Sequence, residues 1–441
     1  MQESEFNRWL LAAIGRSPTA FHVAANVRDL LTDHGFTLLE ESEPWDLSTP
    51  GSYVVVRNGS SLVAFTLNGE DPARTGLRMA GAHTDSPALK VKPSPIRRSH
   101  SYVQLGVEVY GGALLAPWFD RELSLAGRVS WETCAGGLDA GLLDFARPVA
   151  VIPSLAIHLD REANRNRSIN SQTDIVPILM QAAADGDEPV FADILLAQLR
   201  RQHPEIDCRA ILDHDLFFYD PAAPTLTGLA GEFITGPRLD NQLSCWTIAR
   251  ALIDAPERKN SLIILSDHEE VGSGSPEGAG GPLLDSVLER LFPEPGQRQQ
   301  VIRRSLLISA DNAHGVHPNF TDRHDGNHLP RINHGPVIKI NAARRYATTA
   351  LTAGFFRLLC RRQNTDVQEF VMRSDMACGS TIGPLAATRT GMQVVDVGVP
   401  TLGMHSIRET AGTSDCPGLL RALQGYFSLA SDDPLWHGWL S

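Results

Sequence analysis

The spacing of apolar residues changes along this chain, and each change predicts a different kind of element. Between residues 5 and 31 the apolar positions recur at helical spacing, with a break at Ser17-Pro18. Two β-rich runs, 53–57 and 61–67, flank Asn58-Gly59, a pair that is typical of a hairpin turn. The chain is therefore expected to begin with two helical segments and a β-hairpin.

From about Leu243 onward, helical spacing alternates with short apolar blocks. One helical face runs from Leu243 to Ile253, and the blocks at 262–265, 306–308 and 394–397 predict strands. Helices and strands in alternation are typical of α/β architecture.

The middle of the chain has a different pattern. Residues 103–109 alternate between Val or Leu and more polar side chains, and residues 125–131 show a similar run. A period of two residues favours antiparallel strands with one exposed face. We therefore predict an inserted β-rich domain at 93–235, between two parts of an α/β domain at 1–92 and 236–441.

Composition places the chain among globular proteins and limits its partners. Its 441 residues exceed one ordinary domain, and 42% are hydrophobic and 20% charged. The 51 acidic against 39 basic residues give a net charge of -12, which argues against nucleic acid or an anionic membrane as the main partner. Six cysteines without a CxxC pair favour a reducing compartment, and the first residues lack the pattern of a secretion signal. We expect a cytoplasmic protein.

Two adjacent glutamates, Glu269 and Glu270, follow the apolar block 262–265. This block reads as a buried strand, and two like charges at its poorly solvated end repel each other unless cations hold them. The pair therefore predicts a bound metal.

Other metal-capable residues occupy similar places, where functional side chains of open α/β sheets collect. They follow predicted strands or precede the long helix: His83, Asp85, Asp240, Asp311 and His405. Each alone is better explained as a helix cap or an ordinary loop residue. Together they favour a metal centre, with Asp85 in a His-x-Asp arrangement that lets a carboxylate orient the imidazole of His83.

A charge count favours two divalent ions. Asp240, Glu270 and Asp311 supply three negative charges and a hydroxide a fourth, while His83 and His405 stay neutral. If Asp240 bridges two Zn²⁺ ions, one ion takes His83, Asp240 and Asp311, and the other takes Asp240, Glu270 and His405. Glu269 is then free to act as a general base.

Several segments resemble the M18 metallopeptidase family, the aspartyl aminopeptidases. They are His-Thr-Asp-Ser-Pro at 83–87, Arg-Leu-Asp-Asn at 238–241 and Asp-His-Glu-Glu-Val-Gly-Ser at 267–273, with further matches at 309–314, 378–384 and 404–409. The resemblance covers nearly the whole chain. It implies an αβα zinc-peptidase domain with a mixed sheet and an inserted β-rich dimerisation domain. It also implies two zinc ions per subunit on the five ligands above, with Glu269 as base and Asp85 orienting His83.

The same resemblance implies a homo-oligomer, built from dimers into a tetrahedral dodecamer. His158, in the predicted insertion, reads as a strand histidine from the pattern alone. It resembles a family histidine that reaches the active site of a neighbouring subunit. We expect a contact with substrate or transition state in trans, with direct metal ligation as the alternative.

Two further residues are candidates for substrate binding. Lys339 reads as a lysine on the exposed face of a strand, whereas the resemblance implies that it faces an acidic side chain at the first position of the substrate. His317 and the nearby His314 either line the pocket or hydrogen-bond the turn after Asp311.

These features predict a zinc aminopeptidase that acts on peptides with a free N-terminus, with Asp or Glu as one option for the first residue. A metal-dependent carboxypeptidase or deacylase would use the same chemistry but recognise a substrate carboxylate. A noncatalytic assembly or binding protein of the same fold is the third hypothesis. Peptide cleavage that is sensitive to a chelator would exclude it.

Overall fold

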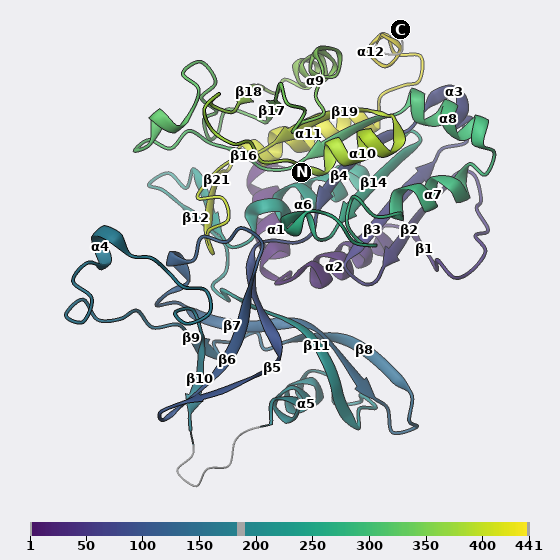
Figure 1. Cartoon of the computed structure of the whole chain (residues 1–441). Helices are drawn as coiled ribbons and strands as arrows, with labels where there is room; N and C mark the ends of the chain where they lie inside the picture. The colour runs from purple at the N-terminus through teal and green to yellow at the C-terminus, as the bar shows by residue number, and fades with distance from the viewer. Residues whose placement is uncertain (1, 183–189, 439–441) are drawn as a thin grey trace. The chain divides into compact units, whose positions relative to one another are not determined.

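The computed structural model describes residues 2–182 and 190–438 (Figure 1). They form two compact units. Unit 1 comprises the described residues up to Asp85, Pro224–Met404 and those from Glu409 on, and unit 2 comprises the described residues of Ser86–Ala223 with His405–Arg408. The units divide after Asp85 and after Ala223, whereas the sequence predicts domain boundaries at 92/93 and 235/236. The segment His405–Arg408 also belongs to unit 2.

Unit 1 contains a nine-stranded mixed sheet in the order β1-β2-β3-β14-β4-β15-β19-β17-β18. The strands are β1 (Thr37–Leu39), β2 (Gly51–Arg57), β3 (Ser61–Leu67), β4 (Arg78–His83), β14 (Ser261–Ser266), β15 (Leu306–Ala310), β17 (Val337–Ile340), β18 (Gln368–Val371) and β19 (Gln393–Gly398). The hairpin of β2 and β3 closes at Arg57↔Ser61, which confirms the turn predicted at Asn58-Gly59.

Four neighbouring strands of this sheet, β14, β4, β15 and β19, are parallel to one another. Their carboxyl ends therefore meet at one edge of the sheet. His83 ends β4, Glu269 and Glu270 follow β14, and Asp311 follows β15. The topology thus brings the strand-end residues of the sequence to one edge.

Helices cover both faces of the sheet (Figure 1). On one face lie α1 (Glu3–Gly15), α2 (Ala20–Asp33), α6 (Leu239–Asp254), α9 (Ala350–Arg362), α11 (Asp415–Phe427) and α12 (Pro434–His437). On the other lie α7 (Leu283–Leu291), α8 (Pro295–Arg304) and α10 (Ile382–Thr390), and the short α3 (Pro72–Thr75) packs on α8. Burial on both sides explains why 262–265 is continuously apolar: Ile263 and Leu265 enter one core, Leu262 and Ile264 the other.

A second, five-stranded sheet in unit 1 has the order β12-β13-β21-β20-β16. Its strands are β12 (Thr225–Thr227), β13 (Phe233–Gly236), β16 (Ala313–His314), β20 (Pro400–Leu402) and β21 (Glu409–Gly412). The 3-10 turns are η2 (Glu269–Val271) and η3 (Thr321–Arg323). The predicted α/β class with a mixed sheet is confirmed.

Unit 2 is β-rich, and its strands pair antiparallel in the order β11-β5-β6-β10-β9-β7-β8. They are β5 (Ala88–Ser99), β6 (Tyr102–Tyr110), β7 (Glu122–Glu132), β8 (Leu138–Asp144), β9 (Ala150–Val151), β10 (Ile178–Gln181) and β11 (Ala210–Tyr219). An additional β11–β7 pairing closes β11, β5, β6, β10, β9 and β7 into a ring. The short elements are η1 (Ala116–Trp118), α4 (Ala163–Asn166) and α5 (Phe191–Gln202).

Apolar residues alternate with more polar ones along β6 and β7 because one face of these strands packs on the core of unit 2. Leu105 and Val107 of β6 are buried in the core, and so are Leu125 and Val129 of β7, while Val103 is also buried. No helix of the described residues is both long enough and apolar enough to cross a membrane.

Candidate metal centre

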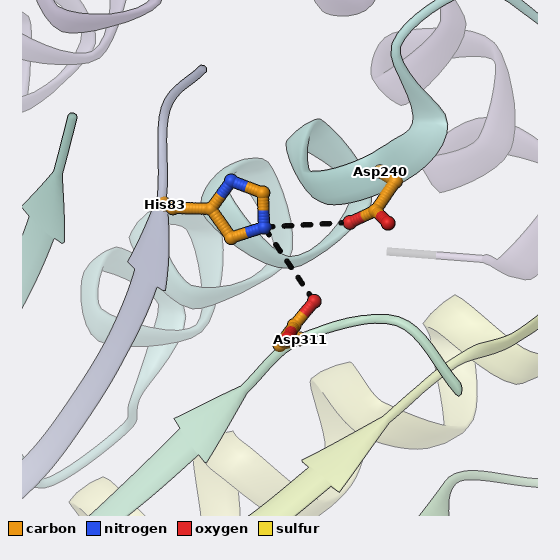
Figure 2. A group of neighbouring side chains, drawn as sticks. All are labelled: His83, Asp240 and Asp311. Carbon is orange, nitrogen blue, oxygen red and sulfur yellow. Dashed lines mark ion pairs between the residues drawn. The ribbon is translucent and has the colours of Figure 1, made fainter. Parts of the chain in front are cut away.

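His83 lies at the centre of a buried group of acidic side chains in unit 1 (Figure 2). Its Nε2 atom is 3.4 Å from Oδ1 of Asp240 and 3.5 Å from Oδ1 of Asp311. Its other ring nitrogen, Nδ1, is 3.1 Å from the backbone oxygen of Asp85 and 3.3 Å from that residue's carboxylate. The imidazole is thus oriented from one side by Asp85 and points its other nitrogen at two carboxylates.

The residues around this group hold its backbone in place. Asp240 lies at a break in α6, where Asp240 and Asn241 have non-helical dihedral angles. The Asp240 N–H donates to the buried carboxylate of Glu409 at 2.8 Å, and the Asn241 amide donates to the carbonyl of Ala310 at 2.9 Å. Asp240 is therefore held by Glu409, and its neighbour Asn241 is bonded to the residue before Asp311, both across long sequence separations. The sequence offered Glu409 only as part of a motif, with no sign of this contact.

Glu269 and Glu270 form a 3-10 turn directly after β14. The Glu269 N–H donates to Oδ1 of Asp85 and the Glu270 N–H donates to Oδ2 of the same carboxylate, each at 3.1 Å. Asp85 therefore orients His83 and also fixes the turn that carries both glutamates. The sequence predicted only the first of these contacts. His83, Glu269 and Glu270 each offer one ligand atom, and these atoms lie within 4.8 Å of one another.

The protonation of this cluster reflects its crowded negative charge. Burial raises the pKa of Glu269 to about 7, with His83 opposing the shift and Asp311 adding to it. Burial, followed by the Asp240 carboxylate, raises the pKa of Glu270 well above its usual value. Burial opposes protonation of His83, but hydrogen bonds to its aspartates outweigh it and raise the pKa of His83. Without a metal, the raised pKa values mean that bound protons offset part of the negative charge of the carboxylates. A bound cation would take the place of these protons.

Lys339 is the ammonium that the structure places beside this cluster. It is 3% exposed, so the reading of an exposed strand lysine is wrong. Its Nζ atom is 3.2 Å from Oδ2 of Asp311. Burial by itself would raise the pKa of Asp311, but Lys339 and His83 outweigh it and hold that pKa well below its usual range. Lys339 thus keeps Asp311 ionised and ready to bind a cation.

Two predicted site residues, His405 and His158, belong to unit 2. His405 has a left-handed backbone with φ 67, and its Nδ1 lies 3.2 Å from the carbonyl of Gly112. His158 is exposed in a turn, so the strand reading is wrong. Their positions relative to the acidic cluster of unit 1 stay predictions.

The two histidines after Asp311 differ in their surroundings. The ring of His314 packs edge-on against Phe370, with centroids 5.5 Å apart, and burial, helped by Lys339, lowers the pKa of His314 to about 4. His317 accepts from the Asn319 N–H at 3.2 Å and packs against Phe320. His317 therefore bonds the turn that follows it, as one of the two sequence readings proposed, and a role in substrate binding stays a prediction.

The donor set fits a zinc site. Zinc binds imidazole nitrogen and carboxylate oxygen, and a ligating histidine commonly donates its other N–H to a backbone or carboxylate oxygen. His83, Asp240 and Asp311 offer ligand atoms within 4.8 Å of one another, and Asp85 supplies the oxygen behind His83. The carboxylates of Asp85, Asp240, Glu269, Glu270 and Asp311 gather around His83, and the ammonium of Lys339 pairs with Asp311. A bound cation would balance this concentration of negative charge.

Comparison with known proteins agrees with this chemistry. The sequence profile of the family described as "Aminopeptidase I zinc metalloprotease (M18)" matches residues 13–427. The chain belongs to the M18 family. It is therefore a metallo-aminopeptidase, a hydrolase that acts on peptide bonds.

Individual M18 proteins resemble the chain over nearly its whole length. A probable M18 family aminopeptidase 2 of Azotobacter vinelandii is 52% identical over 96% of this chain and 98% of its own. In a complex of Ape4 and Nbr1 solved by cryo-electron microscopy, one chain matches with a TM-score of 0.91, 34% identity and coverage of 95% of this chain and 84% of its own. The S. cerevisiae mApe1 dodecamer gives a TM-score of 0.83 at 28% identity, over 98% of this chain and 97% of its own.

Proposed function

We propose that this M18 aminopeptidase holds two zinc ions per subunit and uses Glu269 as its general base. In this proposal His83, Asp240 and Asp311 hold one ion, and Asp240, Glu270 and His405 hold the other. The observation that carries it is the approach of His83 Nε2 to carboxylate oxygens of Asp240 and Asp311 at 3.4 and 3.5 Å. Zinc in such a site supplies Lewis acidity at the scissile carbonyl and makes water a better nucleophile.

Glu269 is suited to move a proton in both directions. Its carboxylate lies beside the ligand atoms of His83 and Glu270, where it can accept a proton from the attacking water and return it to the leaving amine. Asp85 holds the Glu269 N–H at 3.1 Å and so keeps the carboxylate at the site. The free α-amine of the peptide is attracted by the net negative charge of the cluster.

Zinc titration tests the metal stoichiometry. Protein stripped with a chelator and then titrated with zinc should gain peptidase activity up to two equivalents per subunit, with both equivalents detected by elemental analysis. Full activity at one equivalent, with no second tight site, would contradict the dinuclear assignment.

The first residue of the substrate is proposed to be acidic, with Lys339 and its buried ammonium as the attracting group. The pairing of Lys339 with Asp311 at 3.2 Å is compatible with this role, because a substrate carboxylate can approach the remaining N–H groups. Release of neutral apolar residues in preference to Asp and Glu would overturn this preference and leave the metal chemistry unaffected. His317 is proposed as a second substrate contact.

We also propose a cytoplasmic homo-oligomer, built from dimers into a tetrahedral dodecamer, in which His158 reaches the active site of a neighbouring subunit. The similarity to the mApe1 dodecamer supports this assembly. Around His158, the side chains of Leu155, Ile157 and Leu159 are 58%, 49% and 74% exposed, an apolar surface suited to a second copy.

Substitution of His158 should separate a contact in trans from metal ligation. His158→Ala is expected to lower kcat/KM by about a hundredfold, the effect of removing one donor to a transition state, while zinc content stays unchanged. His100→Ala, at another exposed histidine of unit 2, is the matched control and should be neutral. Loss of zinc from the His158 variant would instead favour the ligand reading.

A further inference from the structure

Asp396 of β19 carries a fully buried carboxylate. It lies in a row of residues on neighbouring strands that also contains Ser309 and Lys339. Asp396 pairs with Ser309 of β15, and the register Ile338↔Val397 between β17 and β19 places Lys339 next to it on the other side. Residues that lie opposite each other on neighbouring strands face the same side of a sheet. Asp396 is 0% exposed and has no place in the hydrolytic mechanism above.

Asp396 ties two separate loops to this row. The first loop, 341–349, follows β17, and its Ala347 N–H donates to Oδ2 of Asp396 at 2.6 Å. In the same loop the hydroxyl of Thr348 accepts from the Asp396 N–H at 2.9 Å. The second loop, 372–381, precedes α10, and the hydroxyl of Thr381 donates to Oδ1 of Asp396 at 2.6 Å.

The start of α10 is built around this carboxylate. Thr381 is the N-cap residue of the helix, yet its hydroxyl is given to Asp396 and makes no capping bond. A Cβ atom on Gly383 would lie 2.2 Å from Oδ1 of Asp396, so only glycine fits there. Asp396 therefore lies against the first turn of α10, held there by Thr381 and the close approach of Gly383.

The first loop forms a wall over the Lys339 ammonium, and the second loop packs against that wall. Tyr346 of the first loop lies with its ring centroid 5.4 Å from Lys339 Nζ and packs with Cys378 of the second. The loops are also joined directly, because Arg345 Nε donates to the Gly379 carbonyl at 3.4 Å and the Ser380 hydroxyl donates to the Arg345 carbonyl at 3.2 Å. A shift of the Asp396 side chain would therefore move both loops, 341–349 and 372–381.

We propose that Asp396, acting through Ala347 and Thr381, is a positioning residue that sets the shape of the pocket for the first substrate residue beside Lys339. This inference rests on the proposed function, since it assumes that the side chain of the first residue enters next to Lys339. It does not depend on whether that residue is acidic or apolar, because Asp396 fixes the wall as well as the surroundings of the ammonium.

The test compares substrate selectivity in variants of the full-length, zinc-loaded enzyme. The readout is the ratio of kcat/KM for the best N-terminal residue to that for N-terminal alanine. Thr381→Val removes one hydrogen bond to a charged acceptor at constant shape and should lower this ratio about tenfold. Thr381→Ser keeps the hydroxyl that donates to Asp396 and should show the wild-type selectivity ratio. Thr390→Val, which removes the hydroxyl bond to Ala386 at the other end of α10, is the matched control.

Asp396→Ala should have a larger effect than Thr381→Val, because it releases both loops. Since burial of Asp396 makes that variant prone to misfolding, the Thr381 series decides the outcome. A folded Thr381→Val enzyme with normal zinc content and an unchanged selectivity ratio would overturn the proposal. Failure of the proposed function is distinguishable, because then the wild-type enzyme itself would release no N-terminal residue in a zinc-dependent manner.

Discussion

Glu269→Gln is expected to lower kcat by about a hundredfold to ten-thousandfold, with zinc content unchanged. Glutamine has the size of glutamate but cannot accept the proton of the attacking water. The backbone contact to Asp85 at 3.1 Å does not involve the Glu269 side chain, so the turn should persist. The measurement is steady-state kinetics on a peptide substrate, together with elemental analysis of the purified variant.

The control for this substitution is Glu257→Gln, a glutamate whose side chain is 80% exposed, and it should leave kcat unchanged. A Glu269→Gln enzyme with full zinc content and normal kcat would remove Glu269 as the base. A variant that loses zinc would instead show that Glu269 acts as a ligand.

Asp240→Ala is expected to weaken zinc binding by more than about a hundredfold and to abolish peptidase activity, because Asp240 is the ligand proposed to be shared by both ions. Asp254→Ala, at the other end of α6, is the matched control: it removes a partly buried pair with Arg250, far along the helix from Asp240, and should keep both zinc and activity. Zinc affinity is measured by competition with a chelator of known affinity.

The same variant should behave differently without metal. In chelator, Asp240→Ala is expected to unfold at the same or a higher temperature than the wild-type protein, because one of several crowded buried carboxylates is gone. In zinc, the order should reverse, since only the wild-type protein gains the full binding energy. Unchanged zinc affinity in Asp240→Ala would contradict the ligand assignment.

The ends of the strands could be predicted from the sequence because apolar blocks mark buried strands and chemistry follows at their carboxyl ends. His83, Glu269, Glu270 and Asp311 follow from this rule, and the parallel pairing of β4, β14 and β15 brings their strand ends to one edge of the sheet.

The contacts that orient these residues could not be predicted in the same way. Asp85 accepts from the N–H groups of residues 184 and 185 positions away, and Glu409 accepts from the N–H of Asp240 at a separation of 169. No local period in the sequence records such pairs. The burial of Lys339 could not be predicted for a related reason: its strand alone allows an exposed face, and the Asp311 carboxylate and Tyr346 ring beside its ammonium come from other elements.

Zinc-dependent aminopeptidase activity is measured by cleavage of a panel of peptides with different N-terminal residues, by zinc-loaded and by chelated enzyme. Each peptide is supplied with a free and with an acetylated N-terminus. We expect release of the first residue from the free peptides, only with zinc present, and fastest when that residue is Asp or Glu. Cleavage that survives complete removal of metal, or that proceeds equally well on acetylated peptides, would contradict the assignment of this site as a zinc-dependent aminopeptidase centre.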